Sequence, residues 1–182
     1  LVPIIKDLME NRDEEGFEMN PAMMPEGGSA EDNTRRLADL CDEILTALID
    51  SPELVPRSFF EYLNHVFHAS TARFPDASQY VVGSFFFLRW VCPAIVTPDG
   101  FGLVDEVRSR SVRRALVLVS KVLINLANGV RFSDKKESFM APLNAFVDAN
   151  QERMERFFAV LAVYEPQSDA HDRGDEETEI TF

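Results

Sequence analysis

The stretch "GSFFFLRWVCPAIVTP", residues 83–98, is almost wholly apolar and carries a single charge, Arg89. No other charged residue lies between Asp76 and Asp99. A membrane span needs about 20 apolar residues, and an arginine at mid-bilayer costs at least about 2.5–3.5 kcal/mol. The stretch is therefore predicted to belong to a buried core helix, from about residue 77 to 96, and direct membrane insertion is not expected.

Arg89 and Pro93 pose a local problem within this helix. Proline has no N–H, so the carbonyl of Arg89 loses the donor that residue 93 would supply in a regular helix. A buried guanidinium and a free carbonyl are both costly without partners. Two interpretations follow: Arg89 pairs with an acidic residue elsewhere in the chain, or its planar guanidinium holds the backbone of a functional loop.

Helical periodicity extends along most of the chain. Apolar residues recur every three to four positions in four further stretches, and the first ten residues fit a short helix. The expected helices are 29–50, capped by Ser29 or Asp32, then 56–73, 110–128, closed by Gly129, and 137–163. No strand alternation or internal repeat is present, so an all-α fold packed as an irregular helical bundle is predicted.

Composition limits the function further. The chain has 182 residues, enough for one domain or a large part of one, and a net charge of −13, which disfavours nucleic-acid binding. It starts with leucine, so a fragment of a longer protein is expected. Residues 1–163 should form the folded part. Residues 164–182 are acidic and are expected to be a disordered tail.

Two other residue groups suggest little chemistry. Cys41 and Cys92 are too few for a disulfide framework and are predicted to be reduced, buried thiols of an intracellular protein. Glu61, His65 and His68 share one helix face, but a fourth metal ligand is not evident. No metal site is therefore expected.

The segment "FLRWVCPAIVTP", residues 87–98, resembles the F-L-R-x-x-x-P-A-I-x-x-P signature of Ras GTPase-activating domains of the neurofibromin and p120 type. The resemblance covers roughly residues 1–163 and suggests the C-terminal part of such a domain. It also includes "EDNTRRL" (31–37), "LVLVSKVLINLANGVRF" (116–132) and "FMAPLNAFVDANQERMERFF" (139–158).

The resemblance implies an all-helical domain that binds a Ras-type small GTPase and speeds its GTP hydrolysis. Such a domain regulates an enzyme and is not one itself. It needs no cofactor of its own, because GTP and Mg²⁺ belong to the partner. The implied location is the cytoplasm, with recruitment to the inner membrane surface by other domains as an option.

Roles for the signature residues also follow from the resemblance. Arg89 matches the family arginine that braces the loop carrying the catalytic "finger" arginine. Leu88 would lie on the floor of the GTPase-facing groove. Pro93 and Ala94 would shape the turn of the helix.

Later residues match the rest of the family groove. Lys121 matches a lysine that pairs with a downstream glutamate, here Glu137; the alternative is a solvated helix lysine. Asn128 matches a groove asparagine; the alternative is a helix-terminal cap. Lys135 and Lys136 fall where the family presents basic residues to an acidic switch surface, although exposed lysines are usually only solvated.

The family's finger arginine lies in a segment of the form F-R-x-N-x-x-A-x-K, and none of the 182 residues forms one. Arg12, Arg35 and Arg36 do not stand in that context. The chain alone is therefore expected to bind weakly and to stimulate poorly. The alternatives are a module that binds the GTPase without activating it, like the IQGAP scaffolds, and an adaptor bundle that binds no GTPase.

Overall fold

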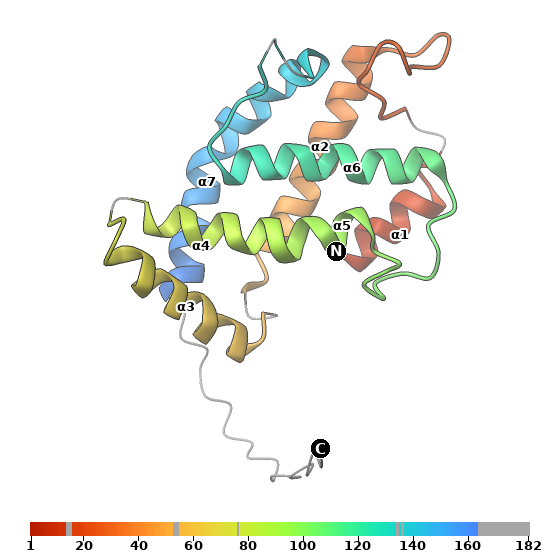
Figure 1. Ribbon diagram of the computed structural model, residues 1–182. Helices are drawn as coiled ribbons and strands as arrows, with labels where there is room; N and C mark the ends of the chain where they lie inside the picture. The colour runs from red at the N-terminus through yellow and green to blue at the C-terminus, as the bar shows by residue number, and fades with distance from the viewer. Residues whose placement is uncertain (14–15, 53–54, 76, 134, 136, 164–182) are drawn as a thin grey trace.

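The computed structural model describes residues 1–13, 16–52, 55–75, 77–133, 135 and 137–163. Within these ranges the chain forms helices and no β-strand, which confirms the all-α class. In chain order the elements are α1 (Val2–Glu10), α2 (Ala30–Ile49), α3 (Arg57–Thr71), α4 (Ser78–Phe86), the π-turn η2 (Phe87–Val91), α5 (Cys92–Val96), α6 (Arg110–Ala127), the 3₁₀ turn η3 (Ser138–Leu143) and α7 (Asn144–Val163) (Figure 1).

Helix α6 occupies the centre of the bundle and packs against α2, α5 and α7. Its N-terminus is capped by Ser109, whose hydroxyl accepts a hydrogen bond from the Val112 N–H at 3.3 Å. Gly129 follows its C-terminus with a φ of 62°, the left-handed conformation that glycine adopts without strain. Both ends of this helix are thus fixed by local chemistry that the sequence displays.

The α4–η2–α5 segment lies antiparallel to α6 (Figure 1). Near one end, the Ser84 hydroxyl donates to the Ala127 carbonyl at 3.4 Å. Near the other end, the Ser120 hydroxyl donates to the Cys92 carbonyl at 3.4 Å. These two contacts set the register between the helices, so Arg89 falls level with the part of α6 just after Lys121.

Glycine allows α4 to approach α7 closely. A Cβ atom on Gly83 would lie 2.3 Å from the ring of Phe158, which is fully buried. A larger residue at 83 would therefore force α4 and α7 apart.

Two helix starts refine the sequence predictions. Ser29, and not Asp32, is the N-cap of α2, and its hydroxyl accepts from the Asp32 N–H at 3.2 Å. The helix predicted from 137 begins instead as the 3₁₀ turn η3, which contains Pro142, and becomes α-helical at Asn144. Proline cannot donate to the α-helical ladder, and the tighter turn accommodates it.

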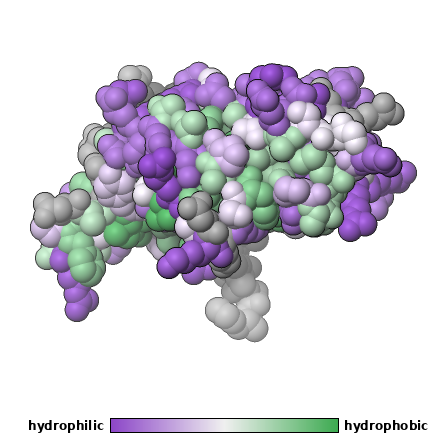
Figure 2. Space-filling model, turned by 90° about the horizontal axis from the view of Figure 1, so that it is seen from above, coloured by the Kyte–Doolittle hydropathy of each residue, from purple (hydrophilic) through white to green (hydrophobic). Residues whose placement is uncertain are grey.

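The surface of the bundle is not uniformly polar. Figure 2 shows apolar side chains exposed on one face between hydrophilic areas. Leu88, Trp90 and Tyr62 are each about half exposed. No described helix combines the length and the apolar character needed to cross a membrane. The acidic segment 164–182 lies outside the described residues.

Candidate functional site

The helix that carries Arg89 contains a π-turn at the signature itself. Helical structure continues from Ser78 to Val96, as predicted, but Phe87–Val91 is π-helical. The Cys92 N–H accordingly bonds to the Phe87 carbonyl, five residues earlier. This wider turn shifts the hydrogen-bond register beside Pro93, and the helix passes the proline without a break. Single π-turns within α-helices are rare and are frequent at functional sites.

The π-turn brings three consecutive side chains to the surface. Leu88 is 52% exposed, Trp90 is 50% exposed, and Arg89 between them is exposed as well. Phe87 and Val91 on either side are buried. The expectation that the Arg89 guanidinium is buried was therefore wrong. The cause is the wider turn, which fits more residues into one revolution and so leaves a longer run facing outward.

Arg89 has no internal partner in the described part of the chain. Its side chain forms no ion pair and no hydrogen bond with any residue in these ranges. Of the two interpretations of this arginine, pairing with an internal acid is thus not seen among the described residues. The guanidinium is free to donate to a loop or to a partner. Pro93 and Ala94, one turn on, are half-buried in α5.

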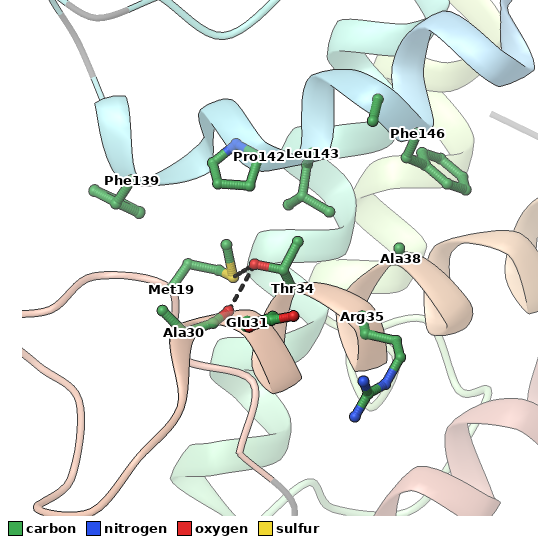
Figure 3. A pocket seen from close by; sticks show the side chains of 11 residues that line it. Met19, Ala30, Glu31, Thr34, Arg35, Ala38, Phe139, Pro142, Leu143 and Phe146 are labelled. Carbon is green, nitrogen blue, oxygen red and sulfur yellow. Dashed lines mark hydrogen bonds between the residues drawn. The ribbon is translucent and has the colours of Figure 1, made fainter.

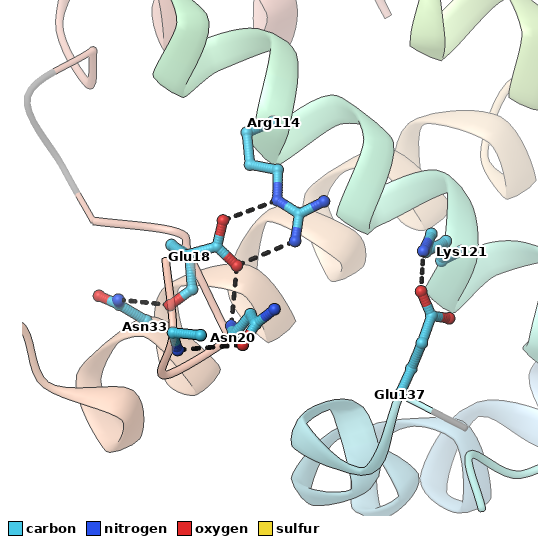
Figure 4. Close-up of polar contacts among 7 residues, drawn as sticks. Glu18, Asn20, Asn33, Arg114, Lys121 and Glu137 are labelled. Carbon is cyan, nitrogen blue, oxygen red and sulfur yellow. Dashed lines mark hydrogen bonds and ion pairs between the residues drawn. The ribbon is translucent and has the colours of Figure 1, made fainter. Parts of the chain in front are cut away.

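Lys121 and Glu137 form an ion pair between α6 and the segment that leads into η3 (Figure 4). Glu137 has a φ of 56°, and it is the one non-glycine residue with positive φ in the described ranges. Its carbonyl also accepts from the Met140 N–H at 2.8 Å. A left-handed glutamate costs roughly 1–2 kcal/mol. Backbone strain of this kind tends to persist where the surrounding structure and function require it.

A second ion pair on the same face of α6 was missed from the sequence. Arg114 donates to both oxygens of the Glu18 carboxylate, at 2.8 and 2.9 Å, and lies seven residues before Lys121 (Figure 4). The Asn20 N–H bonds to the same carboxylate at 2.8 Å, and the Asn33 amide donates to the Glu18 carbonyl at 2.9 Å. Glu18 and Arg114 are 96 positions apart in the sequence, so no local signal marks this pair.

The charges of this pair reinforce one another. Burial opposes ionisation of Glu18, but the hydrogen bonds from Arg114 and Asn20 outweigh it and hold the pKa of Glu18 below its ordinary value. The hydrogen bond to Glu18 raises the pKa of Arg114, and the charges of Glu18 and Glu137 add to that rise. The attraction between Arg114 and Glu137 links this pair to the Lys121–Glu137 pair.

The remaining candidates lie at the far end of α6. Asn128 is the C-cap residue of that helix and is exposed; its backbone N–H bonds to the Ile124 carbonyl at 3.0 Å. Lys135 is exposed in the turn that follows. Lys136 lies outside the described residues.

The described residues offer no metal site and no reactive cysteine. They contain no group of three His, Cys, Asp or Glu residues placed to hold a metal ion. Cys41 and Cys92 are buried free thiols, as predicted. Burial raises the pKa of Cys92 to about 12 and raises that of Cys41 further, so neither sulfur is a ready nucleophile.

A separate hollow of about 590 Å³ lies between the start of α2 and the η3–α7 segment (Figure 3). Its lining is mainly apolar, with Phe139, Pro142 and Phe146 on one side. The Thr34 hydroxyl donates within the chain, to the Ala30 carbonyl at 2.7 Å. The hollow offers apolar contact and no cluster of titratable groups, so we do not take it as the functional site.

Comparison with known proteins shows which proteins this chain resembles. The sequence model described as "GTPase-activator protein for Ras-like GTPase" matches residues 7–128. A probable Ras GTPase-activating-like protein, ngap, of Dictyostelium discoideum is 31% identical over 163 residues, 88% of this chain and 18% of that protein. Neurofibromin-A of the same organism is 33% identical over 134 residues, 71% of this chain and 14% of that protein.

The human Ras GTPase-activating protein 1 is 29% identical over 176 residues, 94% of this chain and 16% of that protein. The chain thus spans less than a fifth of the length of each of these three relatives. The matched residues include α6 and the whole α4–η2–α5 segment.

Proposed function

Because the chain belongs to the family of GTPase-activator proteins for Ras-like GTPases, we propose that it binds a Ras-type small GTPase through the face formed by η2 and α6. We call this the activator face and define it by Leu88, Arg89, Lys121 and Asn128. The observation that carries the proposal is the exposed Arg89, held on a π-turn without an internal partner in the described ranges.

The composition of the activator face suits such a partner. Leu88 supplies apolar area, 52% exposed, beside the cation of Arg89. Lys121 is kept in place by Glu137, and both side chains remain about one-third exposed, at 35% and 31%. The antiparallel register of the α4–η2–α5 segment and α6 places Arg89 level with the part of α6 just after Lys121. A cationic face of this kind complements an acidic switch surface and steers its approach.

Arg89 would act in GTP hydrolysis as a positioning residue. Ras with its activator is the standard example of hydrolysis accelerated by an arginine supplied in trans. The planar guanidinium of Arg89 can donate to several carbonyls at once and so hold the backbone of a segment that carries such an arginine. The nucleotide and its Mg²⁺ come with the GTPase. We propose further that these residues form the C-terminal part of the activating domain.

A second candidate is a module that binds the GTPase without stimulating it. The two candidates share the activator face and differ only in the effect on GTP hydrolysis. Binding and single-turnover hydrolysis, measured separately, therefore distinguish them.

The test uses a Ras-type GTPase loaded either with GDP or with a non-hydrolysable GTP analogue. We expect the chain to bind the GTP-analogue form more tightly, and we expect Leu88→Ala to weaken that binding. Phe101→Ala is the matched control, since Phe101 is 51% exposed in the loop after α5 and lies outside the activator face. A folded chain that binds neither form of any Ras-type GTPase would contradict the proposal.

A further inference from the structure

Trp90, the residue after Arg89, connects the π-turn to α3. Its ring meets the ring of Phe59 edge-on, with centroids 4.7 Å apart and an interplanar angle of 75°. The indole is 50% exposed and borders a hollow of about 490 Å³ that α3 and its N-terminal approach also line. Trp90 is the single tryptophan of the 182 residues.

The Trp90–Phe59 contact continues into the core. Phe59 also meets Phe86 at 5.8 Å, and Phe86 meets Phe157 of α7 at 6.0 Å. Edge-to-face aromatic pairs contribute about 0.5–1.5 kcal/mol each beyond the area that they bury. The indole is thus the outer end of a chain of rings whose inner end is fixed between helices.

The direction of the Arg89 side chain must be set by contacts of neighbouring residues. In the described ranges its own side chain has no partner, and Leu88 before it projects to the surface. The π-turn is hydrogen-bonded i→i−5, so its side chains do not follow the spacing of the α-helices on either side. Trp90 is the exposed neighbour that makes a defined contact with another helix.

We infer that Trp90 is a positioning residue for Arg89. Its contact with Phe59 fixes the rotation of the π-turn about the helix axis, and so fixes the direction in which the guanidinium leaves the surface. The inference rests on the proposed function, because the oriented guanidinium matters only if the activator face meets a partner. It extends that function by assigning a role to α3.

The experiment is a double-mutant cycle on binding of the GTP-analogue-loaded GTPase to the chain. Phe59→Leu removes the ring contact and leaves the exposed indole in place, so it separates positioning from direct contact. We expect Phe59→Leu and Trp90→Ala each to weaken binding about tenfold, and Trp90→Phe to restore most of it. In an Arg89→Ala background, we expect Phe59→Leu to have almost no further effect.

Tyr62→Ala is the matched control. Tyr62 also lies on α3, is 48% exposed, and meets Phe59 at 6.5 Å, but its other ring partner is Phe85 of α4 and not the π-turn. We expect this variant to bind normally. Urea unfolding of each variant, followed by far-UV circular dichroism, separates loss of fold from loss of orientation.

Two results would overturn the inference and are distinguishable. If the wild-type chain binds the GTPase but the effects of Phe59→Leu and Arg89→Ala simply add, then Trp90 does not act through Arg89. The proposed function survives that result. If the wild-type chain binds no Ras-type GTPase, the proposed function fails and this inference fails with it.

Discussion

Two cations of α6, Arg114 and Lys121, differ from Arg89 on the neighbouring antiparallel segment in what they contact. On α6, Arg114 and Lys121 each pair with an acid from an irregular segment. On the neighbouring π-turn, Arg89 pairs with nothing in the described ranges. Arg114 and Lys121 therefore hold irregular segments onto the bundle, whereas Arg89 is available for a contact outside it. The Arg114 and Lys121 pairs thus join elements of the fold, and of the cations on the proposed activator face only Lys121 has such a pair.

The largest effect on GTP hydrolysis is expected from substitution of Arg89. When the segment with the catalytic arginine is present, we expect Arg89→Ala to slow the stimulated GTP hydrolysis about a hundredfold, since a catalytic segment misplaced by about 1 Å costs that much. Arg89→Lys should fail as well, because an ammonium cannot donate as a planar fork. Single-turnover hydrolysis measures both rates.

The stability of the Arg89→Ala variant should be unchanged within about 0.5 kcal/mol, because the side chain is exposed and unpaired in the described ranges. Arg108→Ala is the matched control for charge, as Arg108 is 85% exposed. A variant that loses affinity but keeps its hydrolysis rate would contradict the positioning role of Arg89.

Arg114→Met, unlike Arg89→Ala, is expected to lower the stability of the fold. The Arg114 and Glu18 side chains are only 27% and 12% exposed, so loss of the arginine leaves a mostly buried carboxylate without its cation, with the Asn20 N–H still bonded to it. We expect a loss of about 2 kcal/mol in the free energy of unfolding, less than the 3–5 kcal/mol typical of a fully buried pair. Urea unfolding measures it.

The control for this change is Arg57→Ala, which breaks an exposed pair with Glu61, 65% and 63% exposed. Such surface pairs contribute about 0.3–0.5 kcal/mol. If both variants were destabilised equally, the Arg114–Glu18 pair would be no more than a surface contact, and the contrast between α6 and the π-turn would lose its basis.

The smallest effect is a pH dependence of the same pair. The pKa of Glu18 is lowered in the folded state from an ordinary value of 4.5, so the folded protein favours the charged carboxylate. Its contribution to stability is complete above pH 4.5 and is lost as pH falls through the lowered pKa. The difference in unfolding free energy between wild type and Glu18→Gln should be constant from about pH 7 to 5 and shrink below. A difference that grows in acid would contradict the sign.

The regular parts of the molecule could be predicted from the sequence. The apolar periodicity of α6 and the glycine after it locate that helix closely, because its polar stripe marks which side faces outward. The 83–98 stretch has almost no polar residues to mark a side. A helix could be predicted there from its length and apolar character. The π-turn and the exposure of Arg89 could not, because no polar pattern shows which side faces outward.

The ion pairs of the candidate site also differ in whether the sequence could predict them. Lys121 and Glu137 could be proposed as a pair from the family pattern, and the structure places them in contact. Arg114 and Glu18 could not, because they are 96 positions apart in the sequence and meet only in the folded bundle. Sequence periodicity reports on burial within one element and carries no information on which distant carboxylate reaches a given cation.

Oxidative footprinting of the chain, free and bound to a GTP-analogue-loaded Ras-type GTPase, tests the central claim that the π-turn is the contact surface. Leu88 and Trp90 are compared with Phe74 and Met23, which are 57% and 53% exposed and lie outside the activator face. We expect binding to protect Leu88 and Trp90 and to leave Phe74 and Met23 unchanged. Protection of Phe74 or Met23, with Leu88 and Trp90 still fully oxidised in the complex, would contradict the claim.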